Sequence, residues 1–297
     1  MNVASNQGFR GELRIDEPMS EHTSWRLGGP ADHYFIPADL ADLQHYLSTL
    51  ERDAELLWIG LGSNLLIRDG GFRGHVIAPF AGLNRLELLE QDEVYVECGV
   101  SCAKVARFCQ KRDLGNADFF AGIPGTVGGA LAMNAGAFGG ETWQSVTALT
   151  MINRAGVLTE RNPDEFEVAY REVHHREDEW FAAANFRFAR RAKDEPSNLR
   201  QLLQQRNQSQ PIGQPSCGSV FRNPEGRFAA RLIEEAGLKG LQFGNVQVSA
   251  KHANFIISNP NSRAAEVEAL IAHIQKTVLE RFDIALQREV HITGETL

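Results

Sequence analysis

Apolar residues recur along the chain with two different periods, which predict short strands separated by helices. A helix is expected after Pro37, because leucines recur there at the three- and four-residue spacing of one buried face: Leu40, Leu43, Leu47 and Leu50. Helices are also predicted within 101–114, 199–207 and 227–236, with a short acidic helix from Pro163 and a long amphipathic helix through Val267, Leu270, Ile271, Ile274 and Val278. Short apolar or alternating runs predict strands at 33–36, 56–59, 75–79, 85–89, 94–98, 147–153, 157–159, 184–189, 246–249, 253–258 and 284–292.

The connections between these elements indicate the fold class. Most neighbouring strands before residue 190 are joined by turns or hairpins, such as Arg154-Ala155-Gly156, which favours an α+β fold over a doubly wound sheet. The stretch 193–198 is polar and contains a proline, as domain linkers do. We therefore expect a first domain at 1–192 and a smaller α+β domain at 193–297, whose last strand carries Glu289.

Composition and charge exclude several classes of partner. The 297-residue chain has a net charge of −8 and no block of basic residues, so neither nucleic acid nor a membrane is expected as a partner. Because the first residues resemble no signal peptide and no apolar run approaches the ~20 residues of a membrane span, we expect a cytoplasmic protein. No metal site is expected, since the cysteines lack zinc-ligand spacing and read as buried free thiols: Cys98, Cys102, Cys109 and Cys217.

The segment 119–141 is the clearest candidate for ligand binding. It holds seven glycines and almost no charge. Such density indicates left-handed turns or a backbone that another group approaches closely, and main-chain N–H groups in tight turns suit phosphate oxygens. A glycine-rich hinge or a close helix crossing is the alternative, and the number of glycines favours a ligand.

A second candidate loop follows the strand predicted at 56–59. Gly60-x-Gly62-Ser63-Asn64 resembles half of a dinucleotide fingerprint, but the third glycine and the following helix are missing, so it is not a Rossmann loop. Two interpretations stay open here. The loop is either a strand–turn–strand corner that faces a phosphate or a plain turn.

Three further positions carry possible chemistry. Ser219 lies in a rigid, proline-flanked loop without the G-x-S-x-G pattern of a hydrolase, so it is either a loop serine or a proton donor. Arg171, after Tyr170, offers a planar fork for a carboxylate or phosphate, although a charged strand end is the ordinary explanation. Glu289 alternates away from the apolar face of the last strand, which by itself indicates only a solvent-facing residue.

The order of these motifs resembles the UDP-N-acetylenolpyruvoylglucosamine reductase family over nearly the whole chain. The segments that carry the resemblance include Tyr170-Arg171 and HTSWRLGGPAD (22–32), GLGSNLLIRDGGFRG (60–74), AGIPGTVGGALAMNAGAFGGE (121–141), QPIGQPSCGSVFRNP (210–224), AARLIEEAGLKGLQ (229–242), KHANFIIS (251–258) and LQREVHITGE (286–295). The length and the KHANFIIS segment are similar to the shorter class of the family. The resemblance implies a flavin-binding domain of the vanillyl-alcohol-oxidase type with two subdomains, followed by a substrate domain.

The resemblance also implies the chemistry and its residues. A reductase of this family would hold FAD non-covalently, take hydride from NADPH and reduce the enolpyruvyl ether to UDP-N-acetylmuramate for the cell wall. Arg171 would stabilise developing charge, Glu289 would hydrogen-bond the intermediate and Ser219 would deliver the proton, while Asn223 and Tyr170 would contact the substrate. The implied cofactor contacts are Gly60, Gly62, Ser63, Asn64, Gly122, Ile123, Pro124, Gly125, Thr126, Gly128, Gly129, Asn134, Gly136 and Ala137.

Two departures and two alternatives accompany the resemblance. Val173 stands where the family often has a serine, and Gly115-Asn116-Ala117-Asp118 differs from the usual Gly-Leu-Glu-like stretch.

A flavin oxidase of the same fold would share the glycine loops without needing Ser219 and Glu289. A non-catalytic nucleotide-binding protein would be colourless when purified. For the reductase we expect a monomer.

Overall fold

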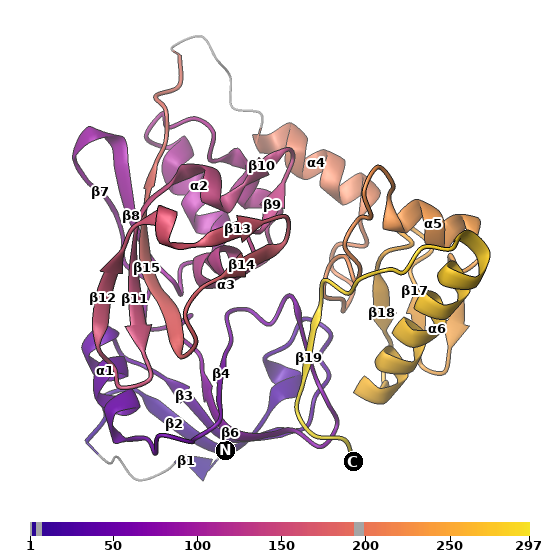
Figure 1. Cartoon of the computed structure of the whole chain (residues 1–297), viewed down its shortest axis with the longest axis horizontal. Helices are drawn as coiled ribbons and strands as arrows, with labels where there is room; N and C mark the ends of the chain where they lie inside the picture. The colour runs from indigo at the N-terminus through magenta and orange to yellow at the C-terminus, as the bar shows by residue number, and fades with distance from the viewer. Residues whose placement is uncertain (1, 4–7, 193–198) are drawn as a thin grey trace. The chain divides into compact units, whose positions relative to one another are not determined.

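The computed structural model describes residues 2–3, 8–192 and 199–297, and its chain forms two compact units (Figure 1). The first unit consists of Met1–Ile15, His33–Gly60 and Gly74–Gln204. The second consists of Asp16–Asp32, Leu61–Arg73 and Gln205–Leu297. The domain boundary predicted at 193–198 lies outside the described residues, and the division at 192/193 stays a prediction.

A five-stranded sheet and one helix begin the fold. Its strands follow the order β1-β2-β3-β6-β4, with bounds Asn2–Val3, Glu12–Pro18, Pro30–Ile36, Phe72–Ile77 and Leu56–Trp58. Helix α1, Leu40–Thr49, begins at Asp39, whose side chain accepts a hydrogen bond from Asp42 N at 2.9 Å. The helix periodicity is confirmed, because Leu43 and Leu47 are buried against this sheet's core.

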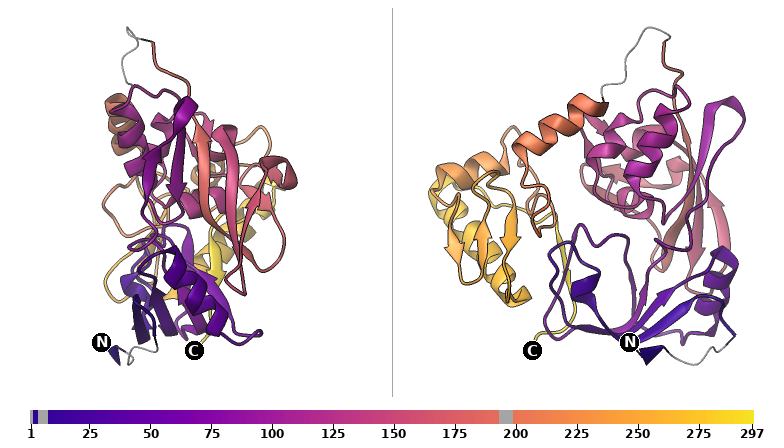
Figure 2. Two further views of the ribbon diagram at one scale, coloured as in Figure 1. Left: turned by 90° about the vertical axis from the view of Figure 1, so that its left-hand side faces the viewer. Right: turned by 180° about the vertical axis from the view of Figure 1, so that it is seen from behind.

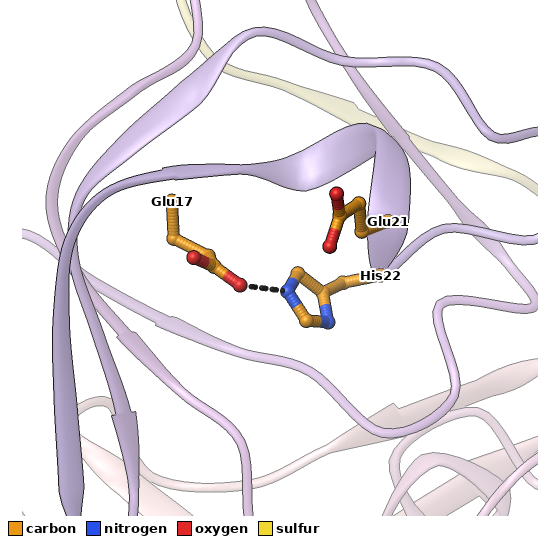
Figure 3. A group of neighbouring side chains, drawn as sticks. All are labelled: Glu17, Glu21 and His22. Carbon is orange, nitrogen blue, oxygen red and sulfur yellow. Dashed lines mark hydrogen bonds and ion pairs between the residues drawn. The ribbon is translucent and has the colours of Figure 1, made fainter. Parts of the chain in front are cut away.

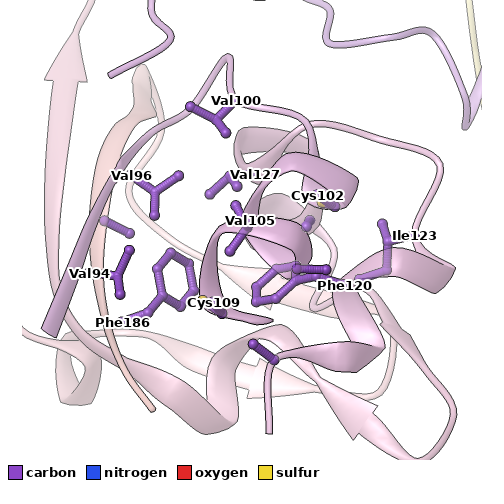
Figure 4. Packing of buried hydrophobic residues seen from close by; sticks show 14 of the residues in the cluster. Val94, Val96, Val100, Cys102, Val105, Cys109, Phe120, Ile123, Val127 and Phe186 are labelled. Carbon is purple, nitrogen blue, oxygen red and sulfur yellow. The ribbon is translucent and has the colours of Figure 1, made fainter. Parts of the chain in front are cut away.

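A second five-stranded sheet forms the larger core of the first unit. Its order is β12-β11-β15-β8-β7, with bounds Leu158–Arg161, Val146–Asn153, Glu179–Arg187, Glu93–Glu97 and Leu86–Leu88. Helices α2, Cys102–Gln110, and α3, Val127–Ala132, pack on it through valines and aromatic rings (Figure 4). Phe120 and Phe186 meet edge to face with ring centres 5.5 Å apart. Both cysteines of α2 are buried in this core as free thiols, as predicted.

Short elements complete the first unit. Two small hairpins pair β9, Gly136–Ala137, with β10, Gly140–Glu141, and β13, Glu167–Ala169, with β14, Glu172–His174. Single 3-10 turns occur at Glu90–Asp92, Asp118–Gly122, Thr142–Ser145 and Pro163–Glu165. The acidic helix predicted from Pro163 is therefore only one turn, and Tyr170-Arg171 form the turn of the β13–β14 hairpin.

The second unit is built around a smaller antiparallel sheet. Its strands are β16, Gln242–Phe243, β17, Val246–Val248, and β18, Ile256–Ser258. Helix α6, Ala264–Phe282, contacts β17 and helix α5, Ala229–Glu235 (Figure 2). Helix α4, Leu199–Ser209, leads into this unit, and a 3-10 turn, Met19–Glu21, follows β2. A core of apolar side chains joins all three chain segments, including Trp25, Leu66 and Val220.

The predicted last strand is only partly confirmed. The regular strand β19 covers His291–Thr293 and pairs in parallel with β5, Leu65–Ile67, while Arg288 makes an isolated antiparallel bridge to Phe221. Leu286 and Val290 are buried as the alternation predicted, but 284–290 and 291–293 have different partners, so no continuous strand covers 284–292. Within the described residues, no helix combines the length and apolar character that a membrane crossing needs.

Candidate active site

Hydrogen bonds of its main chain hold the segment that carries Ser219. Gly218 has φ +69°, and the next residues run as an extended strip in which Val220 N donates to Asn254 O at 2.9 Å. The Ser219 side chain is half-buried, and its hydroxyl makes no hydrogen bond within the described part of the chain. A hydroxyl without an internal partner is available to a ligand.

Cys217 anchors the beginning of this segment. Its sulfur lies 3.5 Å from Gly62 O and 3.4 Å from Leu65 O, so the serine loop rests on the 61–65 loop. Burial raises the pKa of the Cys217 thiol to about 12, although hydrogen bonds with the main chain act in the opposite direction. The thiol is therefore a packed, neutral anchor rather than a nucleophile.

Glu289 lies in the segment 284–290, which runs next to the serine segment. Its N–H donates to Val220 O at 2.8 Å, and Arg222 N donates to Gln287 O at 2.9 Å, so the two segments pair antiparallel. The structure thus brings together two residues, Ser219 and Glu289, that are 70 positions apart in the printed sequence. Loss of hydration lowers the pKa of the neighbouring His291, and the charges of Arg222 and Arg288 add to that shift.

Asn64 ties the 60–64 loop to Glu289. Its Nδ2 donates to Glu289 O at 3.0 Å, and its own carbonyl accepts from His291 N at 3.1 Å. The loop lies between β4 and β5, so it connects two strands, and the phosphate contact considered for it stays a prediction. The side chain of Asn64 is engaged in holding the glutamate strand, which leaves cofactor contacts of this loop to its main chain.

Asn223 caps the helix that follows the serine segment. Its Oδ1 accepts from Ala229 N, the first residue of α5, at 3.0 Å. Its Nδ2 donates to no group in the part of the chain that the structure describes, so this amide has a donor available for a ligand. Because the hydrogen bond from Ala229 N fixes the side chain in one orientation, it also fixes the direction in which Nδ2 points.

One residue at the site was missed by sequence reasoning. Asn254 is 3 % exposed, and its side chain both donates to Phe221 O at 2.8 Å and accepts from Phe221 N at 3.0 Å. The signal that could have found it is a single amide inside the apolar run of 253–257, because a buried polar side chain requires a partner.

The glycine cluster is packed closely on itself. A Cβ at Gly122 would lie 2.4 Å from Ala137 Cβ, one at Gly128 would lie 2.9 Å from Cys98 Cβ, and one at Gly136 would lie 2.5 Å from Gly140 O. The N–H of Gly128 also donates to Cys98 O at 2.8 Å. Close packing, the alternative considered for this segment, therefore accounts for several of its glycines.

Other parts of the cluster remain open to a ligand. A Cβ at Gly129 would meet only Thr126 Oγ1, at 3.9 Å. The N–H groups of Gly125 and Thr126, and in the other unit those of Leu61, Gly62 and Ser63, have no acceptor within the described residues. Gly60 lies against Thr126, since an added Cβ would be 2.4 Å from its Oγ1. In each unit taken by itself, main-chain N–H groups without an acceptor in a tight turn suit phosphate oxygens, such as those of the pyrophosphate of FAD.

Arg171 is fixed on the glycine cluster in the first unit. Its Nη1 donates to Asn134 O at 3.0 Å and its Nη2 donates to Gly136 O at 2.9 Å, while its guanidinium carbon lies 5.0 Å from the centre of the Tyr170 ring. Its φ of +58° is a left-handed conformation that costs about 1–2 kcal/mol in a non-glycine residue. The two hydrogen bonds to main-chain carbonyls fix the guanidinium, although the backbone of Arg171 bears this conformational cost.

Asn134 completes this arrangement. Its Nδ2 donates to Glu141 Oε2 at 3.1 Å and to Ala169 O at 3.3 Å, and its Oδ1 accepts from Trp143 N at 3.2 Å. The side chain is 3 % exposed, so it braces the loop internally. Asn134 thereby contributes to the position of Arg171 through its carbonyl.

A separate group of ionisable side chains lies beside the 3-10 turn after β2. His22 Nε2 and Glu17 Oε1 are 2.8 Å apart, and one ligand atom from each of Glu17, Glu21 and His22 lies within 4.8 Å of the others (Figure 3). Glu17 is 2 % exposed and Glu21 is exposed. The short His22–Glu17 contact explains how the buried carboxylate is tolerated.

Comparisons with known proteins cover nearly all of the chain. The family model "UDP-N-acetylenolpyruvoylglucosamine reductase, C-terminal domain" matches residues 210–293, and the model "FAD binding domain" matches residues 31–161. The crystal structure of a UDP-N-acetylenolpyruvylglucosamine reductase from Thermus caldophilus is similar with a TM-score of 0.81 and 28 % identity, covering 95 % of this chain and 98 % of that one.

Curated relatives show the same likeness at higher identity. UDP-N-acetylenolpyruvoylglucosamine reductase from Alkalilimnicola ehrlichii is 53 % identical over 99 % of both chains. The proteins of that name from Methylococcus capsulatus and Coxiella burnetii are 51 % and 48 % identical, over 96 % and 97 % of this chain and 94 % and 98 % of theirs.

Proposed function

The chain belongs to the UDP-N-acetylenolpyruvoylglucosamine reductase family, and we propose that Ser219, Arg171 and Glu289 perform the steps of its reaction that fall to the protein. It is an FAD-dependent oxidoreductase of peptidoglycan precursor synthesis that uses NADPH. Its fold is an FAD-binding domain of the vanillyl-alcohol-oxidase type followed by the C-terminal domain of this family.

The reaction sets two tasks for side chains. A carbon–carbon double bond conjugated to a carboxylate gains a hydride at one carbon and a proton at the other. Bound FAD supplies the hydride chemistry, which no amino-acid side chain provides. The protein must stabilise the negative charge that develops toward the substrate carboxylate, and it must deliver the proton to one face of one carbon.

Arg171 suits the first task. Two of its nitrogens are fixed by the carbonyls of Asn134 and Gly136, so the guanidinium plane is set before the substrate arrives. A charged donor that needs no rearrangement stabilises developing charge more effectively than a mobile one. Tyr170, whose ring contacts the guanidinium, is proposed as a substrate contact on the same turn.

The observation that carries the proposal is the pairing of the Ser219 and Glu289 segments. The 2.8 Å hydrogen bond from Glu289 N to Val220 O places a hydroxyl and a carboxylate on neighbouring strips of main chain. Glu289 would hydrogen-bond the enol form of the substrate, and Ser219 would deliver the proton. Serine is a weak acid in water, so its contribution is delivery at a fixed position.

The test separates the two half-reactions. Ser219→Ala should leave reduction of bound FAD by NADPH nearly unchanged, because the hydroxyl has no part in that step. Reoxidation by UDP-N-acetylenolpyruvoylglucosamine should slow by ~10²–10⁴. Both rates are measured by stopped-flow absorbance of the flavin without oxygen. Equal slowing of both half-reactions would remove Ser219 from the catalytic assignment, and reoxidation only by oxygen would favour an oxidase.

Cofactor contacts, assembly and location are proposals of the same kind. The main-chain groups of the 60–64 and 122–129 loops are proposed to contact FAD, with support from the N–H groups of Gly125, Thr126, Leu61, Gly62 and Ser63, which have no acceptor within the described residues. We propose a cytoplasmic monomer, in keeping with nucleotide substrates and with the net charge of −8. Sedimentation equilibrium of the holoenzyme measures the assembly state directly.

A further inference from the structure

We propose that Asn254 is a positioning residue for proton delivery, acting through the main chain that carries Ser219. This inference rests on the role proposed for Ser219. Asn254 touches neither that side chain nor Glu289 in any contact described above. Its influence would pass through Val220 and Phe221, the two residues that follow the serine.

The side chain of Asn254 forms hydrogen bonds to the main chain of the serine segment, as a neighbouring β-strand would. An amide side chain offers the same donor and acceptor as a peptide group. Here Nδ2 donates to Phe221 O at 2.8 Å and Oδ1 accepts from Phe221 N at 3.0 Å, while the main-chain carbonyl of Asn254 accepts from Val220 N at 2.9 Å. Three hydrogen bonds therefore join one residue to two consecutive residues of the serine segment.

The opposite edge of the serine segment is held by Glu289. Val220 O accepts from Glu289 N at 2.8 Å, so the segment lies between Asn254 on one side and the glutamate strand on the other. Val220 and Phe221 are each 1 % exposed. Water cannot replace lost partners at such positions, and a buried main-chain group without a partner is strongly disfavoured, so the segment must move if Asn254 is truncated.

Ser219 is sensitive to such a movement because its own side chain has no hydrogen bond within the described residues, so it follows the main chain between the Cys217 anchor and Phe221. No described heavy atom lies within 4 Å of a Cβ placed on the preceding Gly218. The position of the hydroxyl is therefore set by the main chain, which Cys217 holds before the serine and Val220 and Phe221 hold after it. Misplacement of a reacting group by about 1 Å can cost ~10² in rate.

The first test is Asn254→Ala in the holoenzyme. Reduction of bound FAD by NADPH should be nearly unchanged, while reoxidation by UDP-N-acetylenolpyruvoylglucosamine should slow by about 10- to 100-fold. The matched control is Ser258→Ala, which removes another buried hydrogen bond from side chain to main chain, 2.6 Å from Ser258 Oγ to Trp25 O, in the same unit. The control should slow neither half-reaction.

A second variant adds a pH signature that general loss of stability would not produce. In Asn254→Asp an ionised carboxylate would still accept from Phe221 N but would repel Phe221 O. A protonated carboxyl restores the donor, and burial raises the pKa of such a group. Relative to wild type, the reoxidation rate of this variant should therefore rise as the pH is lowered, while NADPH reduction shows no such gain. A pH profile parallel to wild type would contradict the proposal.

A readout without turnover comes from amide hydrogen exchange. Exchange of the main-chain N–H of Phe221, measured by mass spectrometry on peptides spanning 217–224, should be faster in Asn254→Ala than in wild type or Ser258→Ala. Unchanged exchange would show that the side chain does not hold the segment, and would overturn the inference.

The double variant separates this inference from the proposed function. If Asn254 acts through Ser219, adding Asn254→Ala to Ser219→Ala should cause no further slowing of reoxidation. Multiplying effects would overturn the positioning role. If Ser219→Ala itself leaves reoxidation intact, the proposed function fails; if it slows reoxidation and Asn254→Ala does not, only the positioning inference fails.

Discussion

Arg171 shows how much a single side chain depends on the shape of its head group. Its two terminal nitrogens reach separate carbonyls, at 3.0 and 2.9 Å. A lysine ammonium is one compact charge and cannot keep that planar fork. We expect Arg171→Lys to slow reoxidation by the enol ether by ~10²–10³, the usual loss when a fixed charge-stabilising donor is removed.

The matched change for this prediction is Arg176→Lys, on the exposed end of the same stretch of chain. Stopped-flow flavin absorbance gives both half-reactions for both variants. Arg176→Lys should resemble wild type, because its position has no part in the proposed chemistry. Equal losses in the two lysine variants would indicate a general effect of arginine loss.

The four thiols give a prediction that needs no substrate. Burial raises the pKa of each one, to about 12 for Cys109 and Cys217 and further for Cys98 and Cys102. Because the thiolate is the reactive form, a thiol reagent such as dithionitrobenzoate should find almost no reactive group in the native protein at pH 8 and four after denaturation. Rapid reaction of one native thiol would place it at the surface.

The raised pKa of these thiols also makes the stability of the fold depend on pH in a definite direction. The unfolded chain loses the thiol protons at a lower pH than the folded chain, so the folded state holds more protons between the ordinary value of 9.0 and about 12. The contribution to the free energy of unfolding is complete below pH 9 and decreases as the pH rises toward the folded pKa. Urea unfolding at pH 8 and pH 10 should show lower stability at pH 10.

The sequence pointed to some of the candidate site residues and not to others. Ser219, Arg171 and Glu289 were weak candidates by composition and became specific only through the family resemblance. Asn254 was missed, because its function follows from hydrogen bonds to Phe221, a residue 33 positions away. No periodicity or motif records such a contact. The roles of all four residues stay predictions until the half-reactions are measured.

Helix α3 allows packing glycines to be separated from ligand-facing ones. A Cβ at Gly128 would lie 2.9 Å from Cys98 Cβ, whereas one at Gly129 would meet only Thr126 Oγ1 at 3.9 Å. Gly128→Ala should therefore lower the free energy of unfolding by about 1–3 kcal/mol. Gly129→Ala should leave it unchanged or raise it by up to about 1 kcal/mol, since alanine favours helix.

Flavin affinity should follow the opposite order if the open face receives the cofactor. Fluorescence titration of the FAD-free variants should show weaker binding for Gly129→Ala, in spite of its intact fold. Urea unfolding of the same FAD-free proteins supplies the stability half of the comparison. An FAD affinity equal to wild type in Gly129→Ala would place the cofactor elsewhere.

At the scale of elements, the predictions succeeded where one periodicity governs the whole element. Helices α1 and α6 each bury one continuous apolar face, and the sequence period located both. The last predicted strand was wrong in its length, because 284–290 and 291–293 have different partners. Alternation reports which side chains are buried, but it does not report which main chain lies alongside.

The composition of the second unit has consequences for the whole molecule. Trp25 and Leu66 are both fully buried in its core, although they lie far from 205–297 in sequence. The Trp25 indole also donates to Ile256 O at 2.8 Å. Burial of such side chains contributes about 1.5–3 kcal/mol each, a large share of the 5–15 kcal/mol that stabilises a typical domain.

A fragment of residues 193–297 should therefore fail to fold cooperatively. Circular dichroism with urea should show no sharp transition for this fragment, while the full chain shows one. A fusion that adds 16–32 and 61–73 through short linkers should recover part of the transition. A stable, cooperative 193–297 fragment would support the boundary expected from the sequence and show that the early segments are dispensable.

The discontinuity of this unit could not be predicted from local signals. The polar stretch 193–198 resembles a linker, and it marks where the chain is polar rather than where contacts separate. Segments 16–32 and 61–73 look like loops within a first domain until their side chains are seen in the second core. The fold class was predicted, since the types of connection between elements are local; the three-segment assembly depends on distant contacts.

The contact between Asn64 and Glu289, which ties two distant segments together, also determines when during synthesis they can meet. These residues are 225 positions apart, and strand β19 ends only at Thr293. Contacts of such long range form late, because a large loop must close before they are made. On the ribosome the serine and glutamate segments can join only after Glu289 has been synthesised and released from the exit tunnel. A nascent chain interrupted before Glu289 should therefore never pair the two segments, and it should lack reductase activity.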